Sequence, residues 1–203
     1  MFSIVSQAGW PIWPLLALSV AAVAIILERL LSLQTKRIIP PELTAQVLQL
    51  VRAQADDALA LDKLKVSSPL GRILAQLLQH RTLPDAELRR SVEDVGQDVA
   101  FALNRYLAGL ALIATVAPLM GLFGTVIGMI EIFGSTSPGG NSNPVQLAHG
   151  ISIALYNTAL GLVVAVPSMI FYRHFRGKVD TLLVAMEMQA AKLVEIIHGE
   201  RQA

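Results

Sequence analysis

The sequence predicts an all-α integral membrane protein with three transmembrane helices, two of them extended far into the cytoplasm, and a small cytoplasmic helical insert. Of the 203 residues, 54% are apolar and only 15% are charged, which is less charge than a soluble domain of this length carries. All 16 Lys and Arg residues lie in two segments, residues 29–105 and 173–201, while residues 106–172 contain a single acid, Glu131. Membrane insertion explains this partition, because basic residues gather on the cytoplasmic side of membrane spans.

The first expected span is residues 10–33, preceded by an external N-terminus at residues 1–9. The apolar run is long enough to cross about 30 Å of hydrocarbon at roughly 1.5 Å per residue, and Trp10 and Trp13 are typical of a membrane interface. A cleaved signal peptide is the alternative, but such a peptide carries its basic residues before the apolar run. Here Arg29 and the other bases follow it, which predicts a periplasmic N-terminus.

Residues 34–105 are expected to form a cytoplasmic helical insert and the start of a long helix. Three stretches show apolar residues at helical spacing: Glu42–Arg52, Asp56–Leu64 and Pro69–His80. We interpret them as a small bundle of amphipathic helices without chemistry of its own.

A long helix is expected to begin at Pro84-Asp85 and to continue without a stop to Gly134. Gly96 and Gly109 are tolerable inside it, and Pro118 should bend it without ending it. Such a helix has about 49 residues and a length of roughly 73 Å, so its first half must project into the cytoplasm.

The second span is placed at residues 106–133, a periplasmic loop at 134–149, the third span at 150–172 and a cytoplasmic helical extension at 173–203. The loop is rich in Gly, Ser, Asn and Pro and contains no Lys, Arg, Asp or Glu. The third helix is expected to begin near Pro144. The C-terminus is then cytoplasmic.

Small residues recur every three or four positions in the second and third spans. Such stripes let helix backbones approach closely where lipid supplies no hydrophobic drive, so helix packing is their plain interpretation. The residues assigned to helix packing are Gly121, Gly124, Gly128, Gly161, Pro118 and Pro167.

Thr125, Asn157 and Thr158 place hydroxyl and amide groups inside these apolar spans. A polar group in lipid needs a partner on a neighbouring helix or in water, although a threonine can also bond back to its own helix. Thr125 lies nine residues before Gly134. Thr158 lies nine residues after His149, so the two hydroxyls are expected at similar depth. This favours a shared polar layer beside a narrow path.

Glu131 either faces a cavity or lies at the outer membrane interface, and the sequence leaves both interpretations open. There is no Cys, and no metal-ligand cluster, phosphate-binding loop, nucleophile–base pair or dinucleotide motif is present. We therefore expect no metal, no cofactor, no nucleic-acid partner and no enzymatic activity.

Two motifs carry a resemblance to a known family. The core PLMGLFGTVIGM lies within residues 117–133, and ALYNTALGLVVAVPSMIFY lies within residues 150–172. These stretches resemble the two signature helices of the ExbB/TolQ/MotA family of inner-membrane motor proteins. The layout of the whole chain is most similar to ExbB and TolQ, since the MotA branch usually has a fourth span.

The resemblance implies a pentamer of this subunit around a central pore. The pore would hold the transmembrane helices of a dimeric ExbD-like or TolR-like partner, whose aspartate carries the proton. A TonB-like or TolA-like protein would then pass the work to the outer membrane. By motif match, Thr125 and Thr158 resemble the pore-lining threonines of the family, and Glu131 and Asn157 join them as candidate proton-path residues.

One position departs from the family pattern. Well-known ExbB members carry a glutamate five residues before the threonine of the third helix, and the corresponding residue here is Ile153. Our hypothesis is that Glu131 supplies the acidic group from the neighbouring helix, or that the aspartate of the partner suffices alone.

Three alternatives to an ExbB-like energiser remain. The first is a TolQ-like subunit for envelope maintenance, and the second is a scaffold that holds membrane partners and conducts nothing. A self-sufficient transporter is the weakest, because three spans without an inverted repeat do not fit the usual transporter architecture.

Overall fold

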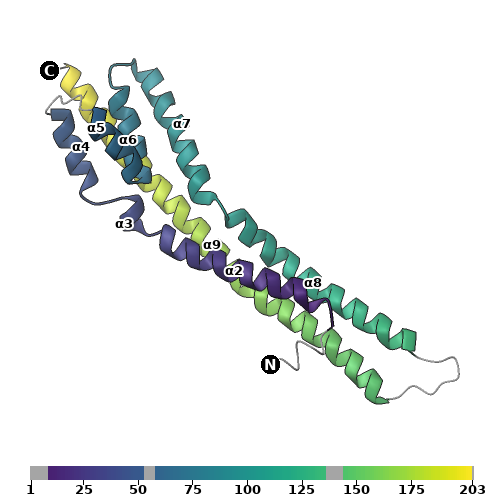
Figure 1. Ribbon diagram of the computed structural model, residues 1–203. Coiled ribbons are helices and arrows are strands. Elements are labelled where there is room, and N and C mark those ends of the chain that lie inside the picture. The colour runs from purple at the N-terminus through teal and green to yellow at the C-terminus, as the bar shows by residue number, and fades with distance from the viewer. Residues whose placement is uncertain (1–8, 53–57, 136–143, 203) are drawn as a thin grey trace. The chain divides into compact units, whose positions relative to one another are not determined.

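The computed structural model of the protein describes residues 9–52, 58–135 and 144–202, in which every secondary-structure element is an α-helix (Figure 1). Three segments are long and apolar enough to cross a membrane: Ile12–Ser32, Ala86–Gly134 and Leu147–Ile196. The all-α class and the three membrane-length segments are thus confirmed.

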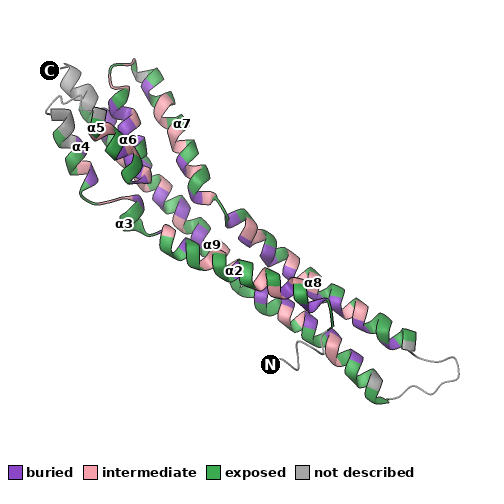
Figure 2. Ribbon diagram, viewed as in Figure 1, coloured by how far each residue is buried: buried purple, intermediate pink, exposed green. Residues whose placement is uncertain are grey.

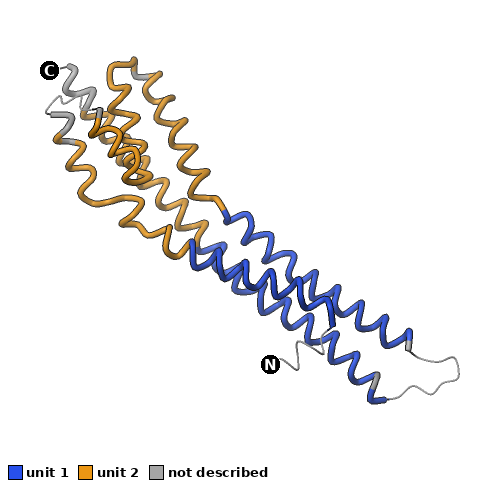
Figure 3. Tube along the Cα trace, in the orientation of Figure 1, with its two compact units in different colours: residues 1–28, 106–174 blue, residues 29–105, 175–203 orange. Residues whose placement is uncertain are grey.

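The chain divides into two units (Figure 3). Unit 1 contains residues 1–28 and 106–174, and unit 2 contains residues 29–105 and 175–203. Unit 1 holds the apolar part of the chain, whereas unit 2 holds nearly all of its charged residues.

Unit 1 consists of the first part of α2 (Ile12–Ser32), all of α8 (Leu107–Ser135) and the first part of α9 (Pro144–Gln202). As expected, α8 continues through Pro118 and α9 begins at Pro144. The last six residues of the segment 134–149, which was expected to be a loop, are residues 144–149, and they are therefore helical.

Helix α2 runs beside α8 in the opposite direction. The ring of Trp10 meets that of Phe123 edge to face, with the ring centroids 5.8 Å apart. Fifteen residues further on, Ile25 packs next to Gly109, where an added Cβ would lie 3.7 Å from the Ile25 Cδ1 atom. Large apolar side chains such as Leu119 and Val163 remain exposed on the outside of this unit (Figure 2), as expected for surfaces that meet lipid or other membrane helices.

Unit 2 is built from short helices packed on the C-terminal part of α9 and the long helix α7 (Asp85–Asn104). Its short helices are α3 (Thr35–Ile38), α4 (Leu43–Arg52), α5 (Ala58–Ser67) and α6 (Pro69–Gln79). The three predicted amphipathic helices are all present, although α5 extends to Ser67 and Asp56 lies outside the described residues. The core of this unit consists of fully buried side chains: Leu33, Ile38, Leu70, Leu74, Leu77, Leu88, Phe175, Met186 and Leu193.

The start of α6 is fixed by a side-chain cap. Ser68 has an extended backbone, and its Oγ accepts a hydrogen bond from the Gly71 N–H at 3.0 Å, while Pro69 occupies the first helical turn. Ser68→Ala should therefore destabilise α6 by about 1 kcal/mol. Hydrogen exchange of the α6 amides should accelerate. Ser67→Ala is the matched control, because the Ser67 hydroxyl donates to the Leu64 carbonyl and caps no helix start. Equal exchange in both variants would contradict the assignment.

The prediction of one uninterrupted helix from Asp85 to Gly134 is wrong. Helix α7 ends at Asn104 and α8 begins at Leu107. Between them, Arg105 is extended (φ −51°, ψ 140°) and Tyr106 has a φ of +67°. The sequence contains no Gly or Pro at this point, so no helix-breaking residue marks the end of α7.

Candidate functional site

Helices α8 and α9 pack closely because glycines face backbone or side-chain atoms of the opposite helix. A Cβ added at Gly161 would lie 2.7 Å from the Ala117 carbonyl oxygen, and one added at Gly121 would lie 2.9 Å from the Asn157 carbonyl oxygen. A Cβ at Gly124 would lie only 2.5 Å from the Asn157 Cβ. Such distances are too short for any side chain at these positions.

The same contacts define how the two antiparallel helices are aligned. Gly121 lies opposite Thr158, and Gly128 lies opposite Ala154, where an added Cβ would be 3.3 Å from the Ala154 Cβ. On this alignment Thr125 lies about 3–5 Å further outward than Thr158, which is less than one helical turn. The two hydroxyls are therefore at nearly the same level.

The direction of each side chain follows from the helical step of roughly 100° per residue. About the axis of α8, the Thr125 side chain is rotated by about 60° from the centre of the glycine face that packs on α9, in the direction of increasing residue number. About the axis of α9, the Thr158 side chain is rotated by a similar angle, in the same sense, from the face that packs on α8. In antiparallel helices, positions displaced in the same rotational sense lie on the same side of the pair. Thr125 and Thr158 thus share one side of the α8–α9 pair.

The opposite side of the pair carries Glu131 and Ile153. Both side chains are rotated by about 60–80° from the packed face of their helix, in the sense opposite to that of the two threonines. Ile132, next to Glu131, lies opposite Gly150, so Glu131 is about 3–5 Å further outward than Ile153. Glu131 is exposed and Ile153 is half-buried.

Each threonine hydroxyl bonds to a backbone carbonyl. The Thr125 Oγ1 donates to the Leu122 carbonyl of its own helix at 2.6 Å, whereas the Thr158 Oγ1 donates across to the Gly121 carbonyl at 3.4 Å. Thr125 is half-buried at the margin of an open, apolar depression on α8, which is lined further by Val126, Met129, Ile130, Phe133 and Gly134. This face of α8 is thus accessible to another membrane helix.

Asn157 occupies a different position from the threonines. Its side chain is fully buried in the notch that Gly124 leaves open, and its Nδ2 donates to the Ile153 carbonyl at 3.2 Å. The structure places this amide inside the α8–α9 contact, away from the side that Thr125 and Thr158 share. Pro167 lies on α9 beyond these contacts, and the helix continues through it.

No group of three His, Asp or Glu side chains close enough to hold a metal ion occurs within the described ranges. The chemically useful feature of this site is the pair of hydroxyls of Thr125 and Thr158, which lie at nearly the same level along the two apolar helices. Hydroxyls at such a place can bond to a mobile ion, a water molecule or a side chain of another helix.

Comparison with known proteins gives consistent matches. Residues 65–188 match the MotA/TolQ/ExbB proton channel family. An ExbB-like biopolymer transport protein of Synechocystis sp. is 34% identical over 166 residues, which are 81% of this chain and 79% of that protein. The biopolymer transport protein exbB1 of Vibrio cholerae is 33% identical over 168 residues, covering 80% of this chain and 73% of that protein. An ExbB homologue of Methanothermobacter thermautotrophicus is 31% identical over 149 residues, or 71% of this chain and 53% of that protein.

Proposed function

The chain belongs to the MotA/TolQ/ExbB proton channel family, and from this premise we propose that it is the ExbB-like subunit of a proton-driven motor in the bacterial inner membrane. Five copies would surround a pore that holds the transmembrane helices of a dimeric, ExbD-like partner. Proton flow through this pore would move the partner, and a TonB-like protein would carry the work to transporters of the outer membrane.

The observation that carries this proposal is the shared placement of Thr125 and Thr158. Both hydroxyls lie on one side of the α8–α9 pair and within one helical turn of each other, in a unit that is largely apolar. A ring of such pairs would present a band of hydroxyls to a helix inserted along its axis. The carboxylate that takes up and releases the proton would come mainly from that inserted helix.

The proposed orientation puts the N-terminus in the periplasm and the C-terminus in the cytoplasm. Basic residues follow α2, at Lys36 and Arg37, and follow the apolar part of α9, at Arg173 and Arg176. Bases at these ends favour a cytoplasmic location for unit 2.

Replacing both hydroxyls tests the proposal. In Thr125→Val/Thr158→Val each side chain keeps its shape and loses its hydroxyl. We expect proton uptake into vesicles that contain the protein with its single-span partner to fall to background, while the oligomer still assembles. The oligomer is measured by native mass spectrometry of the same preparations.

Thr115→Val is the matched control. Thr115 also lies on α8, is exposed, and donates to the Ala111 and Leu112 carbonyls of its own helix, but it lies on neither of the two sides described above. Its removal should leave proton uptake unchanged. If the double variant also keeps full uptake, the protein is a scaffold and the conducting role assigned to it is wrong.

A further inference from the structure

We propose that the open, apolar depression on α8 binds the first turns of α9 from a second copy of this chain. The inference rests on the proposed function, because it specifies how neighbouring subunits of the proposed ring meet. Six residues of unit 1 line the depression: Thr125, Val126, Met129, Ile130, Phe133 and Gly134. The face of α9 that we assign to it carries three exposed apolar residues of the same unit: Ala148, Ile151 and Leu155.

Both faces are uncovered within one copy. Val126 in the depression is 49% exposed, and Leu155 on α9 is 64% exposed. The surface of α8 is hollowed at this place, and a projecting leucine or isoleucine of another helix fills such a hollow. Close van der Waals packing of this kind is what holds helices together in lipid, where no hydrophobic effect acts between them.

The directions of the two faces fit a closed ring. About the axis of α8, the depression is rotated by roughly 150° from the glycine face that packs on α9. About the axis of α9, the Leu155 face is rotated by roughly 120° from its own packed face, in the same sense. Both rotations are smaller than 180° and pass through the side that Thr125 and Thr158 share. Successive copies therefore curve toward the threonine side, and a contact between unlike faces can close on itself in this way.

The membrane fixes the level at which the two faces meet. Copies that are inserted in one orientation lie at the same depth, so the alignment of α8 and α9 within one copy also applies between neighbours. On this alignment Val126 of one copy is level with Leu155 of the next, and Phe133 is level with Ala148. The largest side chain of the depression thus lies opposite a small residue, which permits a close approach of the helices.

Helix α2 of a neighbouring copy does not reach the depression. It begins at Ile12, two residues after Trp10, whose ring contacts Phe123 of α8. Because α2 runs opposite to α8, Ile12 is level with about residue 121. The depression lies beyond this level, at residues 125–134. Among the helices that the structure describes, α9 is therefore the one that offers α8 an exposed apolar face at this depth.

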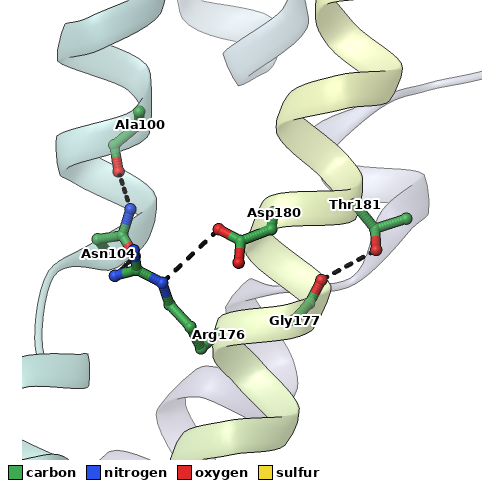
Figure 4. Close-up of polar contacts among 6 residues, drawn as sticks. All are labelled: Ala100, Asn104, Arg176, Gly177, Asp180 and Thr181. Atoms are coloured by element: carbon green, nitrogen blue, oxygen red, sulfur yellow. Dashed lines mark hydrogen bonds and ion pairs between the residues drawn. The ribbon is translucent and has the colours of Figure 1, made fainter.

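The surface of α9 in unit 2 differs from this face, because polar side chains there bond within the same copy (Figure 4). Arg176 donates to the Asn104 Oδ1 atom at 3.4 Å and pairs with Asp180 at 3.6 Å. The Thr181 Oγ1 donates to the Gly177 carbonyl at 2.9 Å. These groups have partners without a second copy, so we assign the contact to the apolar faces of unit 1.

Cysteine cross-linking tests the contact, because the chain contains no Cys of its own. In Val126→Cys/Leu155→Cys the two thiols point away from each other within one copy and meet between neighbouring copies. Oxidation of the full-length protein in lipid vesicles should therefore give a ladder of covalent dimers and larger oligomers. The matched control is Val126→Cys/Tyr156→Cys, since Tyr156 is exposed at nearly the same level but is rotated by about 100° from Leu155. The control should give several-fold less cross-linked protein.

Phe133→Cys/Ala148→Cys is a second pair in the same contact, and a ladder in either pair supports the proposal. The absence of a ladder in both pairs, or an equal ladder in the Tyr156 control, would overturn it. A covalent dimer of Val126→Cys alone would also overturn it, because the depression would then face the same depression of another copy.

Proton uptake by the reduced variants, together with their single-span partner, reports the proposed function separately. Uptake without a ladder would refute the contact between α8 and α9 of neighbouring copies and leave the conducting role intact. A ladder in a protein that takes up no protons, the wild type included, would support the contact and refute the conducting role.

Discussion

Gly161→Ala is expected to destabilise the α8–α9 pair by about 1–3 kcal/mol, even though alanine is the better helix former. The added methyl group would meet the Ala117 carbonyl oxygen at 2.7 Å and the Gly121 Cα at 3.2 Å. Both atoms belong to the backbone, so no side-chain rotation can make room, and the helices must separate. Separation also loosens the neighbouring contacts of Gly124 with Asn157. Association of membrane helices depends on this close packing, because no hydrophobic effect drives two helices together in lipid.

Unfolding in mixed micelles provides the measurement. The two tryptophans, Trp10 and Trp13, lie at the start of α2, and the Trp10 ring contacts Phe123 of α8, so fluorescence reports the packing of this unit. Gly177→Ala on the same helix is the control, since a Cβ there meets no atom within 4 Å. It should be neutral or stabilising by up to about 1 kcal/mol. An equal effect of both substitutions would show that the close contact at Gly161 does not limit stability.

The sequence predicted the fold well where one local signal decided the structure. The separation of charged from apolar segments identified the three spans, and proline and polar residues placed the starts of α6, α7 and α9 correctly. The break at Tyr106 was missed because the residues there, Arg105 and Tyr106, include neither Gly nor Pro and are compatible with a helix. The buried contact of Arg29 with the Leu103 carbonyl, 74 residues away in the sequence, was also not predicted, because Arg29 directly follows an apolar span like any flanking base.

The candidate site was predicted only in part. Counting inward from the loop placed Thr125 and Thr158 at similar depth, and the structure puts them within one helical turn. Which side of the pair each residue occupies depends on the packed face, and the glycine contacts were needed to define it. The burial of Asn157 could not be read from its sequence neighbours, because it depends on the notch at Gly124 in another helix.

Glu131→Gln is expected to lower proton-driven activity. Glu131 lies on the side of the α8–α9 pair that Ile153 occupies, and about 3–5 Å further outward. In well-known ExbB members, which this chain resembles, a glutamate stands at the position of Ile153. A carboxylate on α8 can therefore reach the region that a carboxylate on α9 would serve, and glutamine keeps its size while removing the ionisable group. Activity is measured as proton uptake into vesicles that contain the protein and its single-span partner.

The decisive comparison moves the acid rather than only removing it. Glu131→Gln combined with Ile153→Glu should restore proton uptake, because it returns a carboxylate to the same side and nearly the same level from the other helix. Glu187→Gln is the control, since this exposed acid lies in the part of α9 that belongs to unit 2 and should not influence uptake. Undiminished uptake in Glu131→Gln would remove Glu131 from the mechanism and leave the acid of the partner as the sole carrier. Loss without recovery in the double variant would instead mean that Glu131 acts from α8 alone, at a place that residue 153 cannot reach.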